Sequence, residues 1–285
     1  MLWFLLALFG AFGQATNFAL TKKFLGTIDK NTFAAGTYFI SFILTFALTL
    51  YFGFPQIKEG FWFALLATGG LNIIAVFLNY KALQISDLSL TIPMIAFSPV
   101  FSIFISFILL NELPTLMGIV GIIFTVLGIY AINFFNGKGF LEPFKQIYKN
   151  KGAMMMLGVA FVYSITANFD KIVIQTTDVF LGPALTFLFL SIFFFALSMK
   201  NKTKIQVFQK NLLPFLLIGF VGFIGGLAIS IALTMQIVPY VLSVKRTSIL
   251  FGVIYGGILF KETQAKNRLI GAIITVIGLV LILAF

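Results

Sequence analysis

Long apolar runs, separated by short polar breaks, repeat along the whole chain. Most hold roughly 20 residues or more, the length that a helix needs to cross a lipid bilayer. Such runs are too long for buried strands, and a lone segment in lipid satisfies its own backbone hydrogen bonds only as a helix. The pattern therefore predicts an all-α membrane protein with ten transmembrane helices. The runs are Leu2–Thr21, Thr32–Phe54, Phe61–Tyr80, Ser89–Leu110, Thr115–Phe135, Gly152–Gln175, Phe180–Met199, Leu212–Gln236, Val238–Phe260 and Asn267–Phe285.

The longest polar break divides these runs into two sets of five. It covers Asn136–Lys151 and contains two glycines, a proline and four lysines. We predict a first five-helix repeat at residues 1–136, a basic linker at 137–151 and a second five-helix repeat at 152–285.

The two halves resemble each other in sequence. A shift of 150 residues, without a gap, aligns Ala82-Leu83 with Ala232-Leu233, Ser98 with Ser248, Phe101 with Phe251, Glu112 with Glu262, Gly121 with Gly271, Thr125-Val126 with Thr275-Val276 and Gly128 with Gly278. Because five is an odd number, the second copy must cross the membrane in the opposite sense. Inverted repeats are typical of secondary transporters, whose substrate site lies where the repeats meet. An old duplication without any transport function is the alternative.

Composition narrows the class of protein further. The chain is 60% hydrophobic and only 9% charged, whereas soluble domains are about 25% charged. Cysteine and histidine are absent, which removes disulfides, thiol nucleophiles, the metal sites built on those residues and the usual imidazole proton carrier. We expect no metal, no cofactor and no nucleic-acid partner. The expected partners are the bilayer and a small-molecule substrate, and a homodimer is left open.

Charges between the runs predict an orientation for a multi-pass protein of the cell membrane. One side of the ten-helix arrangement, which also holds both termini, receives only Lys58 and Lys171. Because positive loops stay in the cytoplasm, this pattern places both termini outside. The other side receives Lys22, Lys23, Lys30, Lys81, Lys138, Lys145, Lys149, Lys151, Lys200, Lys202, Lys204, Lys210, Lys261, Lys266 and Arg268.

Lys245 and Arg246 stand side by side inside the ninth run. Each cation near the middle of a span costs about 2.5–3.5 kcal/mol on insertion scales, so neither is expected to face lipid. Arg246 offers a planar fork for phosphate or carboxylate, and Lys245 adds a point charge. We expect the pair to bind an anion, with internal ion pairing and gating as alternatives.

The chain resembles the EamA-type members of the drug/metabolite transporter superfamily. The resemblance covers essentially the whole sequence and is clearest in Asn79–Pro114 and Tyr240–Glu262, each followed by a Gly-x-x-x-Thr-Val-x-Gly helix. It implies ten helices in two inverted five-helix halves around a central cavity that moves small organic solutes. It also implies cytoplasmic termini, in conflict with the loop charges. The Lys-Arg pair is similar to one in plastid triose-phosphate translocators, where the pair holds the substrate's phosphate.

Other polar residues inside the runs are candidates for the same site. Asp170 and Lys171 lie near the end of the sixth run, from which Lys171 could reach the Lys-Arg pair and Asp170 could form an ion pair with Arg246. Asn17 and Asn168 occur in the similar segments QATNF and ITANF, and they either contact substrate or bond between helices. Tyr163 and Tyr240 could border a cavity, and Tyr240 could instead belong to an interfacial belt.

These residues support one leading function and several alternatives. We expect a secondary transporter, not an enzyme, that moves a small organic metabolite with a phosphate or carboxylate by alternating access. No nucleotide-binding motif occurs, so a gradient or exchange must drive it. An exporter of apolar or cationic compounds or amino acids, with Lys245 and Arg246 paired internally, is the second hypothesis. A membrane-embedded enzyme acting on lipid-linked phosphates and a channel are more remote, because intramembrane acids are scarce and no filter-like segment is visible.

Overall fold

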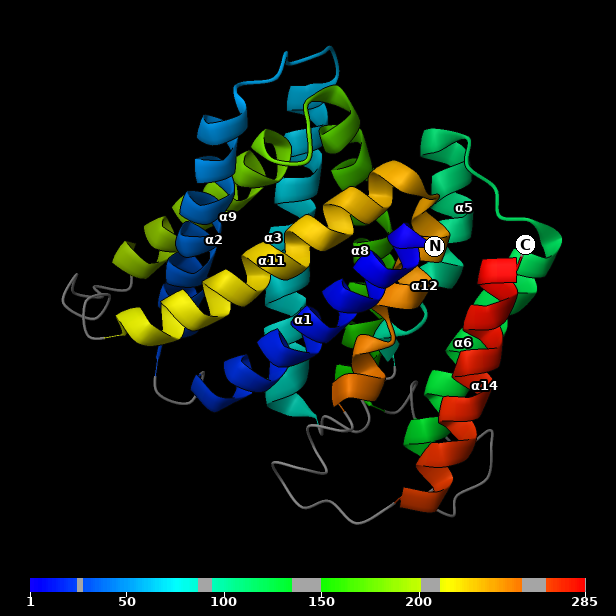
Figure 1. Cartoon of the computed structure of the whole chain (residues 1–285). Helices are drawn as coiled ribbons and strands as arrows, with labels where there is room; N and C mark the ends of the chain where they lie inside the picture. The colour runs from blue at the N-terminus through cyan, green and yellow to red at the C-terminus, as the bar shows by residue number, and fades with distance from the viewer. Residues whose placement is uncertain (25–27, 87–93, 135–149, 201–210, 253–264, 285) are drawn as a thin grey trace.

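The described part of the chain is helical and contains no strand. A computed structural model describes residues 1–24, 28–86, 94–134, 150–200, 211–252 and 265–284 (Figure 1). Its helices are α1 (Leu2–Phe24), α2 (Lys30–Phe52), α3 (Phe61–Ile85), α5 (Ser98–Leu110), α6 (Leu116–Phe134), α8 (Lys151–Thr176), α9 (Leu181–Lys200), α11 (Leu212–Met235), α12 (Val238–Lys245) and α14 (Ala265–Ala284).

Helix lengths and surfaces suit a bilayer. Six helices in the described residues are long and apolar enough to cross one, namely α1, α2, α3, α8, α9 and α11. Large apolar side chains also lie on the outside, such as Phe63, Ile108 and Leu116 with exposed fractions of 72%, 76% and 78%. An apolar surface of this extent is stable against lipid tails and not against water. The protein is therefore a multi-pass membrane protein, and six of its predicted spans have the required length in the structure.

The described segments that connect the helices gather at two opposite ends of the molecule, as their hydrogen bonds show. The α2–α3 connection meets the end of α8 through Lys58 N–H, which donates to the Thr176 carbonyl at 2.8 Å. The α5–α6 connection meets the start of α12 through Thr115 and Tyr240. We call this the short-loop end, formed by residues 53–60, 111–115, 177–180 and 236–237. At the opposite end, the Ser86 hydroxyl donates to Asn150 and Thr32 bonds to Ser198.

The helices pair across the two halves of the chain in a symmetric way. α1 packs on α11, and α8 packs on α3 in the equivalent way. α2 packs on α9, and α6 packs on α14. The α6–α14 pair lies at one side of the molecule (Figure 1). It crosses closely because a Cβ at Gly121 would meet the Gly278 carbonyl at 2.8 Å, and a Cβ at Gly128 would collide with the Thr275 backbone. The glycines that align at a shift of 150 residues are thus the residues that let these two helices touch.

The ninth predicted span is not one continuous helix. α12 ends at Lys245, Arg246 and Thr247 form a turn, and helix resumes at Ser248. The fourth span has the same break at Ala96 and Phe97, which align with Arg246 and Thr247 at the 150-residue shift. The backbone bonds also correspond: Phe97 N–H donates to Met94 as Thr247 N–H donates to Val244. Our prediction of an unbroken helix from Val238 to Phe260 was wrong over the described residues, and residues 253–260 lie outside them.

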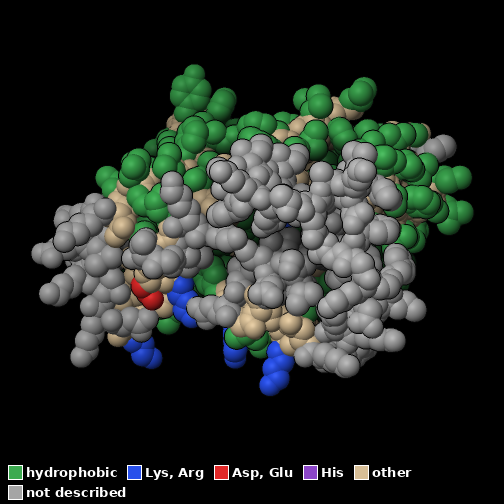
Figure 2. Space-filling model, turned by 90° about the horizontal axis from the view of Figure 1, so that it is seen from below, with side chains coloured by type: hydrophobic (Ala, Val, Ile, Leu, Met, Phe, Trp, Pro, Cys, Tyr) green, Lys and Arg blue, Asp and Glu red, His purple; other side chains and the backbone are tan. Residues whose placement is uncertain are grey.

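Basic side chains gather on part of the surface. Viewed from below, hydrophobic side chains cover much of the described surface, and the Lys and Arg side chains in view lie along one side of it (Figure 2). Such gathering is what the loop charges predict for one end of a membrane protein. The orientation of the termini and the three boundaries at 136, 151 and 152 stay predictions, and 136 lies outside the described residues.

Candidate binding cavity

A cavity of about 360 Å³ lies between the two repeats. Its wall is formed by α1, α2 and α3 of the first half and by α8, α9, α11 and α12 of the second half. Side chains that can bind a polar solute line it, including Asn17, Tyr163, Asp170, Lys245 and Arg246. The structure therefore brings together five of the eight side chains that the sequence marked as candidates.

Arg246 is fixed in the cavity wall by contacts with both repeats. Its side chain is 2% exposed, and Nε donates to the Ser98 hydroxyl at 2.6 Å. Its guanidinium carbon lies 5.7 Å from the centre of the Tyr163 ring, within the range of a cation–π contact. Ser98 is the first residue of α5, so the bond joins the two equivalent helix breaks. Among the described residues, Arg246 forms a hydrogen bond only through Nε, so its terminal amino groups can bind an anion in the fork geometry of arginine.

Lys245 lies next to Arg246 but forms fewer polar contacts with the described side chains. It is the last residue of α12 and is partly exposed to the cavity. Within the described residues its ammonium group has no hydrogen-bond or ion-pair partner. The C-terminal end of α12 offers a favourable potential for a cation, but a helix end does not replace a counter-ion inside a membrane.

Asp170 faces the same cavity from α8. Its Oδ1 accepts a 2.5 Å hydrogen bond from the Thr68 hydroxyl, whose oxygen accepts in turn from the Asn72 amide at 3.1 Å. Among the described residues, no ion pair shorter than 4.0 Å joins Asp170 to Lys245 or Arg246. The cavity thus holds two cations and one carboxylate that are not paired with one another.

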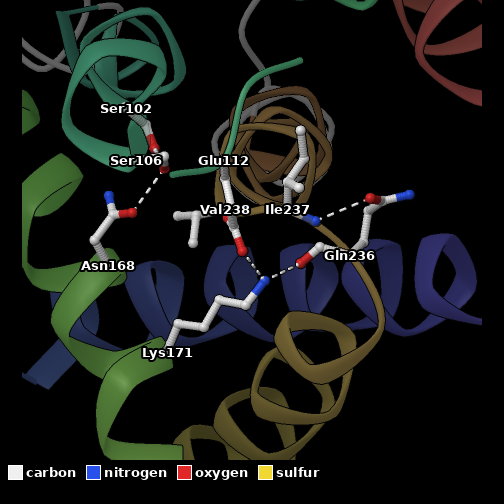
Figure 3. Close-up of polar contacts among 8 residues, drawn as sticks. All are labelled: Ser102, Ser106, Glu112, Asn168, Lys171, Gln236, Ile237 and Val238. Carbon is white, nitrogen blue, oxygen red and sulfur yellow. Dashed lines mark hydrogen bonds and ion pairs between the residues drawn. The ribbon is translucent and has the colours of Figure 1, made fainter. Parts of the chain in front are cut away.

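Lys171 lies outside the cavity, in a network at the short-loop end (Figure 3). Its Nζ lies 2.5 Å from Glu112 Oε1 and donates to the Gln236 carbonyl at 2.7 Å, and its side chain is 7% exposed. The other oxygen, Glu112 Oε2, accepts from Val238 N–H at the start of α12 at 3.0 Å. Glu112 thus accepts a hydrogen bond at the N-terminus of α12. Lys171 does not converge with Lys245 and Arg246 in this conformation.

Asn168 and Tyr240 also lie outside the cavity lining. Asn168 is fully buried, accepts from the Ser106 hydroxyl at 2.6 Å and donates to the Ser164 carbonyl, so it joins α8 to α5 (Figure 3). Tyr240 is buried, and its hydroxyl accepts from Thr115 N–H at 3.1 Å. It is therefore not a residue of an interfacial belt. The aligned pair Asn17 and Asn168 has diverged, because only Asn17 faces the cavity.

Several cavity residues were missed from the sequence. Gln14, Asn72 and Asn79 are amides inside apolar helices, a type of residue that usually faces the interior of a bundle, so a systematic search for such amides would have found them. Tyr38 and Tyr80 also line the cavity. Nothing in the sequence separates these two from the other aromatic residues of the chain.

Comparisons with known proteins agree with this architecture. No curated protein matches the sequence. One solved structure, a crystal structure without a functional description, superposes with a TM-score of 0.76 over 98% of this chain and 95% of the other, at 12% identity. An identity this low shows the fold alone. The model of the EamA-like transporter family matches twice, at residues 1–134 and 150–284. The resemblance seen in the sequence is confirmed: the chain belongs to the EamA-like transporter family, whose members are membrane transporters.

Proposed function

We propose that the protein is a secondary transporter that carries a small organic anion, with a phosphate or carboxylate group bound by Lys245 and Arg246. The supporting observation is that both cations line a cavity between the repeats and that neither has a carboxylate partner among the described residues. A buried charge without a partner is costly in a membrane. A bound anion would supply the missing partner, so binding of the solute would also compensate the charges of Lys245 and Arg246.

The position of Asp170 separates this proposal from the second hypothesis. A carrier of purely apolar or cationic compounds requires Arg246 or Lys245 to be neutralised internally, and Asp170 is the acidic residue that lies inside one of the predicted spans. In the described residues Asp170 bonds to Thr68 and Arg246 bonds to Ser98, and no ion pair joins them. The geometry therefore favours an anion from outside the protein as the partner of the two cations.

The cavity also limits the solute. A volume of about 360 Å³ lies at the lower end of small-molecule sites and suits a compound of a few carbon atoms. Arg246 would donate hydrogen bonds to two oxygens of the anionic group, and Lys245 would add a third contact. The amides of Gln14 and Asn17 would orient polar substituents of the solute. The chain has no nucleotide-binding motif, so a solute gradient or exchange would drive transport.

Contacts between the two repeats support alternating access as the mechanism in this proposal. Between the cavity and the short-loop end lies an apolar cluster that includes Trp3, Ile174, Leu233 and Val238. Beyond it, the Lys171–Glu112 ion pair ties the second repeat to the first. In this proposal these contacts close the short-loop end, and they separate when the repeats rock about the breaks in the fourth and ninth spans.

A binding screen on purified protein tests the proposal. Thermal shifts would be recorded with phosphorylated and carboxylated metabolites and with neutral and cationic compounds, for wild type and Arg246→Gln. Lys81→Gln is the matched control, because it removes an exposed cation outside the cavity. We expect an anion to raise the Tm of wild type and of the control but not of Arg246→Gln. If no anion shifts the transition, or if Arg246→Gln responds like wild type, the proposal is wrong and the second hypothesis takes its place.

A further inference from the structure

The cavity contains charges of both signs, and the negative one has no role in binding an anion. We propose that Asp170 binds a cationic group of the solute, so that the site selects compounds carrying an anionic and a cationic group at once. This inference rests on the proposed function, since it assigns the anionic group of the same solute to Lys245 and Arg246. It adds a specificity residue on α8, opposite in charge to the pair at the end of α12.

The hydrogen bonds around Asp170 leave its carboxylate able to accept a hydrogen bond from a ligand. The Asn72 amide donates to the oxygen of Thr68, which leaves the Thr68 hydroxyl hydrogen directed to Asp170 Oδ1. A donated hydrogen bond favours the ionised carboxylate. No hydrogen bond from the described residues reaches Oδ2, and this oxygen is not among the buried polar atoms left without a partner. Oδ2 is therefore open toward the cavity and able to accept from a ligand.

No basic side chain in the described part of the chain forms an ion pair with Asp170. Lys171, the next residue, is committed to Glu112 and the Gln236 carbonyl. Arg246 is held by Ser98 at the other side of the site. Lys245 shares the cavity but forms no ion pair with Asp170 within the described residues.

The separation of opposite charges in one small cavity favours a solute that carries both charges. If they served only stability, pairing them directly would compensate both, because an unpaired buried ion is strongly destabilising. Asp170 and Arg246 are instead each bonded to a neutral hydroxyl, that of Thr68 and that of Ser98. A solute with both charges completes both partial sites, whereas a simple anion leaves the carboxylate uncompensated.

Matched compounds test this inference by calorimetric titration of the purified full chain. The pairs are acetate and glycine, butanoate and 4-aminobutanoate, and ethyl phosphate and phosphoethanolamine, which differ chiefly by an amino group. A hydrogen bond to a charged group corresponds to roughly a tenfold or larger change in affinity. We expect wild type to bind the amino member of at least one pair at least about tenfold more tightly, and Asp170→Asn to lose that preference. Asparagine keeps an oxygen that accepts from Thr68, so the variant removes the charge and not the bond.

The outcomes separate this inference from the proposed function. If amino-free members bind as tightly as their partners in every pair, and Lys245→Gln weakens them, the role of Asp170 is refuted and the anion site stands. If Asp170→Asn keeps the wild-type preference, Asp170 is refuted as its source. If wild type binds no member of any pair, both proposals are overturned for small charged solutes. The comparison within wild type needs no variant, so it decides the question even if Asp170→Asn does not fold.

Discussion

Lys245 and Arg246 are neighbours in sequence but differ in what holds them, and this difference gives the first prediction. Lys245→Gln removes a cation without any hydrogen bond to the described residues. We expect the affinity for the bound anion to fall about tenfold to a hundredfold, as for one charged hydrogen bond, and the Tm of the unloaded protein to stay equal or rise, because an unpaired buried charge is removed. Arg246→Gln should lower both the affinity and the Tm, because Ser98 also loses its partner. Calorimetric titration and thermal unfolding of the two variants check this. Equal losses of Tm would contradict it.

The residues that could be predicted from the sequence are those whose polarity stands out in an apolar run. Arg246, Lys245, Asp170, Asn17 and Tyr163 all reach the cavity. The partner of Lys171 could not be predicted, because Glu112 lies in a distant connection and only the packing of the repeats brings the two together. The same holds for Ser98, a small hydroxyl with no distinguishing sequence signal.

At the scale of elements, the Lys171–Glu112 network connects the α5–α6 connection to α8 and to the start of α12. Glu112→Gln leaves a buried ammonium group without its counter-ion, which costs about 3–5 kcal/mol when such a pair is broken. We expect a clear drop in the Tm of the purified protein. Adding Lys171→Met should restore part of the lost Tm, because the unpaired ammonium group is then removed. A double variant that is no more stable than Glu112→Gln would contradict this account.

Close packing of α6 on α14 gives a second prediction at this scale. A side chain at Gly128 would collide with the backbone of Thr275, whereas one at Gly158 on α8 meets nothing within 4 Å. Gly128→Ala should destabilise the protein by about 1–3 kcal/mol, as overpacking does. Gly158→Ala is the matched control and should leave stability unchanged or slightly higher, because alanine is the better helix former. Thermal unfolding of both variants decides, and equal Tm values would refute the role of the glycine.

Helix positions were predictable because a bilayer imposes long apolar runs, and the described helices begin and end within a few residues of most predicted boundaries. The break at Arg246 and Thr247 was not predicted, since neither residue is a helix breaker by itself. The turn is fixed by tertiary contacts, among them the bond from Arg246 to Ser98 at the equivalent break. A pattern of hydrophobicity contains no signal for such a contact.

At the scale of the whole molecule, the loop charges predict that the short-loop end faces outward. The chain has no cysteine, so single cysteines can report orientation without background. Lys58→Cys lies in the α2–α3 connection and Lys81→Cys near the end of α3, and both positions are exposed. On intact cells a membrane-impermeant maleimide should label Lys58→Cys and not Lys81→Cys. The reverse pattern would place both termini in the cytoplasm, as the family resemblance implies.

The central claim is that the two cations in the cavity bind the anion that is transported. Uptake of the anion found in the binding screen, measured in proteoliposomes preloaded with the unlabelled compound, tests it most directly. We predict saturable uptake by wild type and by the control Lys81→Gln, and a loss of about tenfold or more in Lys245→Gln at subsaturating solute. Saturable uptake that is unchanged in Lys245→Gln, or binding without any uptake by wild type, would contradict the account.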